Sequence, residues 1–193
     1  DLLEIYAKKD AEYPKKLFPL LYKLIPNGNK KWYKNEIDLL GIIYRMEVHG
    51  ILIDIPYVLE LQNQLNNQLY KIENEIYDSV GYRFDIQSNE QIASILYDKL
   101  KLPILKRTDK SNSPSTDKDV LKQLKHPIAD KIIKYHEIGK LLSTYIPAFR
   151  NVDSNNRVHP TWNPLGTRTS RFSSENPNFQ NITKTDLLYR AII

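Results

Sequence analysis

The sequence predicts a fold that is mainly α-helical with a small β part. Two series of apolar residues at helical spacing indicate long helices, and one alternating segment, Arg157 to Trp162, indicates an extended strand. The first series consists of Val58, Leu61, Leu65, Leu69, Ile72 and Ile76. The second series consists of Ile128, Ile132, Tyr135, Leu142 and Tyr145. Because both apolar stripes are narrow, we expect the two helices to pack against each other as an antiparallel pair.

The first 24 residues predict a helix that is interrupted by prolines. Apolar side chains between Leu2 and Leu24 recur on one helical face, but Pro14 and Pro19 fall inside the series. Because an interior proline removes a hydrogen bond and crowds the preceding turn, we expect the helix to run to about Tyr13 and then to kink or restart.

A turn at residues 26–29, PNGN, separates this helix from the next one. The second helix is evident from Glu36 onwards and should end before Gly50, since glycine adopts the left-handed conformation that closes a helix without steric cost. Pro56 then begins the first long helix, where its missing N–H loses no hydrogen bond.

Two short helices are expected between the long ones. Ser88 and Gln91 fit a capping box, in which Ser88 accepts from the Gln91 N–H and the Gln91 side chain reaches back. Residues 106–115, KRTDKSNSPS, contain too few apolar side chains to be buried and predict a loop. Thr116 should cap the second short helix, with Asp119 in its first turn.

The carboxyl-terminal segment predicts a β-hairpin and a polar surface. A turn at residues 163–166, NPLG, follows the alternating segment, and a second extended run should begin after it. Residues 167–182, TRTSRFSSENPNFQNI, which we call the polar strip, concentrate hydroxyl, amide and guanidinium groups. Such groups donate hydrogen bonds to phosphate oxygens and to base-edge acceptors. A polar loop between two strands is the alternative interpretation.

Length and composition fit one substantial globular core. The chain has 193 residues, is 41% hydrophobic and carries a net charge of +5, which only moderately favours an anionic partner. No apolar run approaches the ~20 residues that span a bilayer, so no membrane partner is expected. The absence of cysteine excludes disulfides and thiolate metal sites, and it fits a reducing compartment.

Five segments occur in an order that matches one known family. The polar strip has the pattern T-x-T-x-R-x-S-S-x-x-P-N-x-Q-N-I, which resembles an early-palm signature. Residues 114–121, PSTDKDVL, are similar to a thumb tip, and residues 140–145, KLLSTY, to the end of a thumb helix. Residues 6–17 resemble a third exonuclease motif, and residues 36–54 resemble the helix and turn that follow it. Together these segments resemble the family A DNA polymerases, the bacterial DNA polymerase I type.

The resemblance implies three parts. Residues 1–30 would be the end of a 3′–5′ exonuclease domain, and residues 31–150 would be a thumb built on the helix pair with small helices at its tip. Residues 151–193 would be the start of a palm with its first β-hairpin. In the family the first catalytic aspartate motif would follow Ile193, so we expect this chain alone to be inactive and to bind no cofactor.

The resemblance also implies an activity for the parent protein. A DNA-directed DNA polymerase, a nucleotidyltransferase of replication or repair, adds deoxynucleotides to the primer 3′ end of duplex primer–template DNA. Its Mg²⁺ would be held by palm aspartates outside this chain. The expected location is intracellular, in a bacterial cytoplasm, a phage-infected cell or an organelle.

The polar strip would contact DNA in the minor groove. Purine N3 and pyrimidine O2 acceptors are present there at every Watson–Crick pair, so arginine and amide side chains test pair shape without reading sequence. Arg171 matches the family's primer-end arginine, while Ser170 replaces the usual glycine and Thr183 the usual proline. The implied contact residues are Thr167, Thr169, Arg171, Asn178, Gln180 and Asn181.

The thumb would contact DNA phosphates through two further sets. The helix-end set is Lys140, Ser143 and Thr144, where residues 140 and 144 are i,i+4 neighbours; a solvated helix face is the alternative. In the tip set, hydroxyls and the N–H groups of a helix start would bind one phosphate; a plain helix cap is the alternative. The tip set consists of Ser115, Thr116, Lys106, Arg107 and Lys110.

Tyr6 and Asp10 resemble part of a two-metal exonuclease site, in which several carboxylates hold the ions. The other acidic motifs would precede Asp1, so Asp10 is expected to be a remnant metal ligand that cannot hold two ions by itself. The four histidines show no ligand spacing, and His159 is expected to be structural.

Two alternative functions remain open. The chain could be a subunit of a split polymerase that assembles with the remaining palm-fingers polypeptide. It could also be a non-enzymatic DNA-binding remnant of a polymerase. The genomic sequence downstream of Ile193 would discriminate among the three, because a D-Y-S-x-I-E-like segment there would indicate the parent enzyme.

Overall fold

The computed structural model of the chain describes residues 2–109, 111–169, 171–182 and 186–193. The chain divides into two compact units, Asp1–His49 and Gly50–Ile193. Among the described residues, no helix combines the length and the apolar character that a membrane crossing requires.

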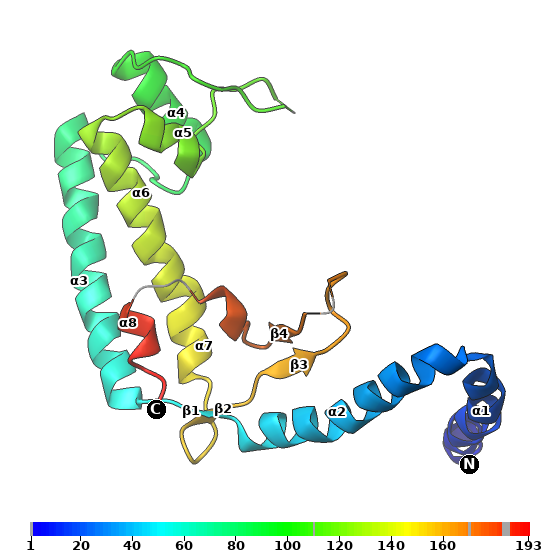
Figure 1. Cartoon of the computed structure of the whole chain (residues 1–193). Coiled ribbons are helices and arrows are strands. Elements are labelled where there is room, and N and C mark those ends of the chain that lie inside the picture. The colour runs from blue at the N-terminus through cyan, green and yellow to red at the C-terminus, as the bar shows by residue number, and fades with distance from the viewer. Residues whose placement is uncertain (1, 110, 170, 183–185) are drawn as a thin grey trace. The chain divides into compact units, whose positions relative to one another are not determined.

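The first unit consists of α1 (Leu2–Leu24), a short 3₁₀ turn η1 (Asn27–Asn29) and α2 (Lys30–His49) (Figure 1). α1 continues through Pro14 and Pro19, so the expected end of the helix near Tyr13 is wrong. Each proline removes one hydrogen bond, but it fixes φ near the helical value, so the helix continues past both prolines.

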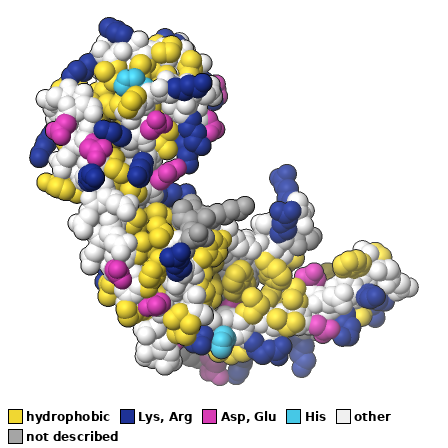
Figure 2. Space-filling model, turned by 60° about the vertical axis from the view of Figure 1, so that its left-hand side comes forward, with side chains coloured by type: hydrophobic (Ala, Val, Ile, Leu, Met, Phe, Trp, Pro, Cys, Tyr) yellow, Lys and Arg dark blue, Asp and Glu magenta, His cyan; other side chains and the backbone are white. Residues whose placement is uncertain are grey.

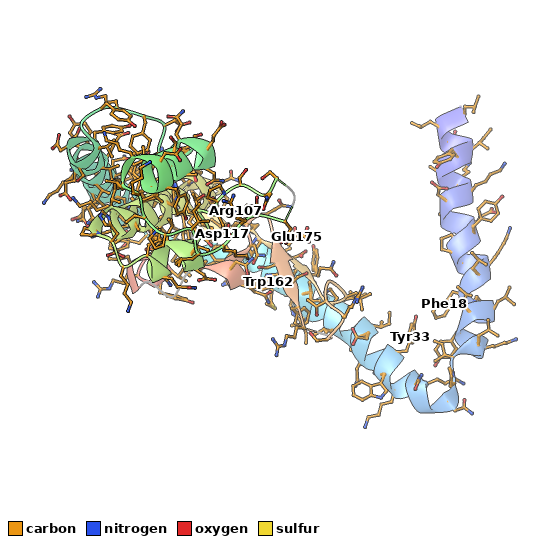
Figure 3. The ribbon with its side chains drawn as sticks, turned by 90° about the horizontal axis from the view of Figure 1, so that it is seen from above. Phe18, Tyr33, Arg107, Asp117, Trp162 and Glu175 are labelled. Atoms are coloured by element: carbon orange, nitrogen blue, oxygen red, sulfur yellow. The ribbon has the colours of Figure 1, made fainter. Side chains whose placement is uncertain are left out.

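Ring contacts join the two helices of this unit. Phe18 stacks on Tyr22 within α1, and Tyr22 meets Tyr33 of α2 edge to face with 5.6 Å between ring centroids (Figure 3). α1 has no buried residue among those described, and Ile43 is the buried residue of α2. The first unit therefore exposes most of its apolar side chains.

The second unit is built on the predicted pair of long helices. α3 (Ile55–Val80) lies beside α6 (Pro127–Lys140), which continues through a π-helical turn, η3 (Leu141–Tyr145), into α7 (Ile146–Arg150) (Figure 1). The mainly α fold with an antiparallel helix pair is thereby confirmed. Of the predicted apolar series, eight side chains are buried: Val58, Leu61, Leu65, Ile72, Ile76, Ile128, Ile132 and Tyr145.

Local signals determine where α3 starts and stops. The Asp54 side chain accepts a hydrogen bond from the Tyr57 N–H at 3.0 Å, and Pro56 occupies the first turn as expected. Gly81 closes the helix in the left-handed conformation with φ of 89°. Across the pair, Lys131 forms an ion pair with Glu75 at 3.3 Å.

The tip of the helix pair carries α4 (Asn89–Ala93), a π-helical turn η2 (Ser94–Lys99) and α5 (Lys118–Gln123) (Figure 1). The Ser88 hydroxyl accepts from the Gln91 N–H at 3.4 Å, as predicted. The Gln91 side chain instead accepts from the Asp85 N–H, since the Ser88 N–H donates to the Asp85 carbonyl.

The predicted cap of α5 is wrong. Asp117 occupies the N-cap position without a side-chain cap hydrogen bond, and Thr116 precedes it. The Thr116 hydroxyl donates instead to Asn89 Oδ1 at 3.1 Å, a partner 27 residues away. This tertiary partner outcompetes the local cap that the sequence indicated.

Within the described ranges, four short strands form two antiparallel sheets. β1 (Ile51–Leu52) pairs with β2 (Arg157–Val158), and β3 (Thr161–Asn163) pairs with β4 (Ser173–Glu175) (Figure 1). The alternating segment 157–162 therefore belongs to two sheets, because Pro160 lacks the N–H that a continuous ladder needs. The second arm of the hairpin begins at Ser173 rather than directly after the turn. The chain ends with a 3₁₀ turn, η4 (Phe179–Asn181), and α8 (Asp186–Tyr189).

Gly50 and His159 meet where the first sheet forms. Gly50 has φ of 64°, and a Cβ placed on it would lie 2.8 Å from the His159 ring and from the Val158 carbonyl oxygen. His159 Nε2 also lies 3.2 Å from Asp153 Oδ2. A backbone hydrogen bond from the Arg157 N–H is the main cause that lowers the pKa of Asp153, with His159 contributing further. These contacts agree with a structural role for His159.

Candidate nucleic-acid interface

The carboxyl-terminal end of the polar strip is a tightly hydrogen-bonded turn. Asn178 Oδ1 accepts from the Gln180 N–H at 3.0 Å and from the Asn181 N–H at 3.2 Å, which caps η4. The Ser174 hydroxyl donates to the same Oδ1 and accepts from the Phe179 N–H at 3.0 Å. Ser174 is fully buried, whereas Asn178 is exposed, so the network runs from the interior to the surface and fixes the turn.

Two apolar anchors flank the exposed amides of this turn. The Phe179 ring packs edge to face on the buried Phe149, with 5.4 Å between centroids, and Ile182 is buried in the core. The side chains of Gln180 and Asn181, which lie between the anchors, are exposed. The fold therefore presents two carboxamides from a rigid backbone.

The helix-end set lies on the exposed side of the π-helical turn that ends α6. Lys140, Ser143 and Thr144 are exposed, whereas Tyr145 is buried. The Tyr145 hydroxyl donates a hydrogen bond to the carbonyl oxygen of Asn181. One helical turn thus carries the predicted phosphate contacts outside and a bond to the polar strip inside.

Thr167 organises the loop that carries Arg171. Its hydroxyl accepts from the Arg171 N–H at 2.9 Å and donates to the Arg171 carbonyl at 2.8 Å. The hydroxyl of Thr169 lies 3.5 Å from that of Thr167, and the Arg171 side chain is exposed. Ser170 lies outside the described residues. The Thr167 hydroxyl is therefore placed to orient Arg171 by holding the Arg171 backbone.

The tip set is only partly exposed. Ser115 is buried, its hydroxyl accepts from the Asp117 N–H at 3.3 Å, and its carbonyl accepts from the Tyr97 hydroxyl. The structure therefore does not bring the Ser115 hydroxyl to the surface, while Thr116 is half-buried. Lys106 and Arg107 are exposed.

The tip carries charges of both signs. Arg107 donates to the Asn112 carbonyl at 2.8 Å, and Lys118 forms an ion pair with Glu137 at 2.6 Å. Figure 2 shows dark blue basic side chains interspersed with acidic ones over this end of the unit. Lys110 lies outside the described residues. The tip therefore offers scattered cations rather than a continuous basic patch.

A groove of about 560 Å³ runs along α6 and is lined by one residue of the tip set and one of the helix-end set. Thr116 of the tip set and Lys140 of the helix-end set both line it. The half-buried His136 also lines the groove, and its Nε2 lies 2.8 Å from the Ile86 carbonyl, which joins α6 to the segment before α4.

Tyr6 and Asp10 are both exposed on α1, one helical turn apart. Among the described residues, no group of three or more His, Cys, Asp or Glu side chains is placed to hold a metal ion. We therefore assign no metal-dependent step to the described residues, and the role of Asp10 as a remnant ligand stays a prediction.

Sequence reasoning missed the internal supports of the polar strip. It included Ser174 in the pattern without a role, and it assigned Tyr145 only to the helix pair. A buried tyrosine carries a hydroxyl that needs a partner, and that is the signal that could have indicated a link to another segment. Gly166 also supports the polar strip, because it allows the close approach of Ser173: a Cβ at residue 166 would lie 1.9 Å from Ser173 Oγ.

Comparisons with known proteins agree on one family. The family model described as DNA polymerase family A matches residues 55–192. DNA polymerase I of Helicobacter pylori (strain ATCC 700392 / 26695) is 39% identical over 150 residues, which cover 76% of this chain and 16% of that protein. The thermostable DNA polymerase I of Thermus aquaticus is 34% identical over 183 residues, 91% of this chain and 22% of that protein.

A solved structure is similar in fold. The POL domain of Pol1 from M. smegmatis, in complex with DNA primer-template and dNTP, has a TM-score of 0.73 at 28% identity. The match covers 81% of this chain and 28% of that one. The chain thus spans only 16% and 22% of the two curated relatives described above.

Proposed function

This chain belongs to DNA polymerase family A, and on that premise we propose that it is the part of a DNA-directed DNA polymerase that holds duplex primer–template DNA. The observation that carries the proposal is the turn at residues 178–181. Its backbone N–H groups are held by the side chains of Asn178 and the buried Ser174, while the side chains of Gln180 and Asn181 stay exposed. Rigidly presented amide donors suit minor-groove acceptors, whose positions vary little among the base pairs.

In the proposal, DNA is bound through two kinds of contact, one in the minor groove and one at the backbone phosphates. Arg171, Gln180 and Asn181 bind minor-groove acceptors near the primer end. Lys140, with the hydroxyls of Ser143 and Thr144, binds backbone phosphates. These contacts set the register and orientation of the duplex without reading its sequence. Their exposure in the structure supports this assignment.

The remaining predicted contacts have supporting roles in the proposal. Thr167 positions Arg171, and the hydroxyl of Thr169 lies beside it. Asn178 holds the turn through Oδ1, and its exposed side chain supplies the amino group for the DNA contact. At the tip, Lys106 and Arg107 add exposed cations. Lys110 and Thr116 are proposed to contact DNA phosphates as well.

The proposal divides the chain as the family resemblance does. Residues 1–30 are the end of an exonuclease domain, residues 31–150 are the thumb, and residues 151–193 begin the palm. The family match from residue 55 onwards supports the last two parts. In packing, α2 belongs with α1, since the first compact unit extends to His49.

The parent enzyme, in this proposal, adds deoxynucleotides to a primer with the help of Mg²⁺, inside the cell. Two-metal chemistry requires several carboxylates close together. The described residues bring no such group together, so we expect the 193-residue chain alone to extend no primer and degrade no 3′ end. Primer extension and exonuclease assays with Mg²⁺ test this expectation. Turnover that a point mutation in this chain abolishes would contradict it.

Equilibrium binding tests the proposed function directly. The purified chain is titrated with a fluorescent duplex, with a single strand of the same length, and with a duplex of scrambled sequence. We expect tighter binding to either duplex than to the single strand, and equal binding to the two duplexes. A chain that binds no duplex, or that prefers one sequence strongly, would refute the proposal.

A further inference from the structure

The junction between the polar strip and the end of the long helix points to a positioning residue. We propose that Tyr145 couples the phosphate contacts of the helix-end set to the minor-groove amides of residues 178–181. This inference rests on the proposed function, and it adds a residue that touches neither DNA nor substrate.

Tyr145 shares its helical turn with the helix-end set. Lys140, Ser143 and Thr144 are exposed, while Leu141 and Tyr145 of the same π-helical turn are buried. Phosphate contacts and the tyrosine hydroxyl therefore belong to one rigid segment. A shift of this segment on DNA binding must move the hydroxyl as well.

Tyr145 also makes a hydrogen bond to the polar strip. Its hydroxyl donates to the carbonyl of Asn181, the last residue of η4. Phe149, four residues further along the helix, packs edge to face on Phe179 of the same turn. A polar and an apolar contact thus fasten one end of the long helix to the amide turn.

The turn at residues 178–181 is itself held by side-chain hydrogen bonds. Asn178 Oδ1 holds the N–H groups of Gln180 and Asn181, and buried Ser174 holds that of Phe179. Because these bonds fix the turn as a unit, a displacement of the Asn181 carbonyl reorients both exposed amides. Tyr145 therefore transmits the position of the helix end to the minor-groove contacts through a contiguous chain of bonds.

A simple packing role for Tyr145 makes a different prediction, and Tyr97 provides a matched control. Both tyrosines are buried, with 6% and 7% of their surface exposed, and each donates its hydroxyl to a backbone carbonyl. The Tyr97 bond reaches Ser115 at the tip, away from the polar strip. The substitutions Tyr145→Phe and Tyr97→Phe thus delete the same kind of bond in two places.

The test measures dependence on minor-groove acceptors. Binding of the 193-residue chain to a duplex is compared with binding to a duplex whose purines are 3-deazapurines, which lack the N3 acceptor. We expect the unsubstituted chain and Tyr97→Phe to bind the 3-deazapurine duplex about three- to tenfold more weakly, the equivalent of one or two hydrogen bonds. Tyr145→Phe should bind both duplexes almost equally.

Salt dependence separates loss of amide alignment from loss of phosphate contacts. Tyr145→Phe should keep the slope of log affinity against log salt, whereas Lys140→Ala should make it shallower by about 0.9. Circular dichroism checks that each variant is folded. If Tyr145→Phe does not fold, Phe179→Leu, which removes the ring contact but keeps an apolar anchor, should show the same loss of discrimination.

The outcomes distinguish the inference from its premise. An unsubstituted chain that fails to discriminate between the two duplexes overturns the proposed minor-groove contact, and the coupling with it. In the other outcome, the unsubstituted chain discriminates between the two duplexes and Tyr145→Phe, or Phe179→Leu in its place, discriminates equally well. That result leaves the proposed function standing and overturns the coupling alone.

Discussion

Several short polar side chains that the family pattern marks as DNA contacts bond mainly to their own chain. Thr167 binds the backbone of Arg171, Asn178 caps η4, and the hydroxyl of Ser115 is buried. Threonine, asparagine and serine compete well for nearby backbone groups because their side chains are short. The long side chains of Arg171 and Gln180 escape this competition, and the predictions about DNA contact rest most firmly on them.

At the residue scale, Arg171→Ala should weaken duplex binding far more than Arg168→Ala. Both arginines are exposed in the same loop, but the backbone of Arg171 is clamped by Thr167. A lost charge-assisted hydrogen bond corresponds to about tenfold or more in affinity. We expect less than about twofold for Arg168→Ala, where an exposed cation contributes little. Fluorescence anisotropy on one duplex compares them, and equal losses would contradict the placement of Arg171.

The buried hydroxyl of Ser174 provides a stability prediction. Ser174→Ala leaves the Phe179 N–H without its partner and removes a donor to Asn178, so we expect a loss of about 1–3 kcal/mol. Ser173→Ala is the control, since Ser173 is half-buried beside it and should cost under about 0.5 kcal/mol. Urea unfolding measures both. A Ser173→Ala variant as unstable as Ser174→Ala would contradict the assigned network.

At the element scale, the long helices could be predicted because burial follows their apolar period. The series from Val58 to Ile76 and the start signal at Pro56 are local, and α3 forms from Ile55 to Val80 around them. The start of α5 depended on a partner distant in sequence, since Thr116 binds Asn89 instead of capping. Such tertiary competition cannot be read from spacing alone. The internal support of the polar strip was missed for the same reason, because Tyr145 and Asn181 are 36 residues apart.

Two glycines in different elements should respond with opposite sign to alanine. Gly50 has φ of 64°, and a Cβ there would lie 2.8 Å from a backbone carbonyl, so Gly50→Ala should destabilise the protein by at least ~1–2 kcal/mol. Gly139 lies inside α6 with nothing within 4 Å of an added Cβ. Gly139→Ala should therefore stabilise the protein by about 0.5–1 kcal/mol. Thermal unfolding of the two variants checks the signs, and a stabilising Gly50→Ala would refute the junction described above.

At the scale of the whole molecule, charge is distributed rather than concentrated. The net charge is +5, and the tip mixes cations with acidic partners such as the Lys118–Glu137 pair. The proposed function is to hold duplex DNA of any sequence, and the scattered phosphate contacts and shape-testing amides of the proposal fit it better than a basic patch or a base-reading helix. Composition and motif order could predict that the charge is distributed. They could not predict which cations form ion pairs within the chain, as Lys118 does with Glu137.

Distributed contacts predict a particular salt dependence of duplex binding. Each neutralised phosphate contributes a slope of about −0.9 to log affinity against log salt, so three to five contacts give about −3 to −5. We expect Lys140→Ala to remove about one contact from this slope, and Lys118→Ala to leave it nearly unchanged because Lys118 is paired with Glu137. Titrations at four or more salt concentrations measure the three slopes. A flat dependence for the unsubstituted chain would contradict the proposed phosphate contacts. A larger change for Lys118→Ala than for Lys140→Ala would show that the phosphates are bound elsewhere on the molecule.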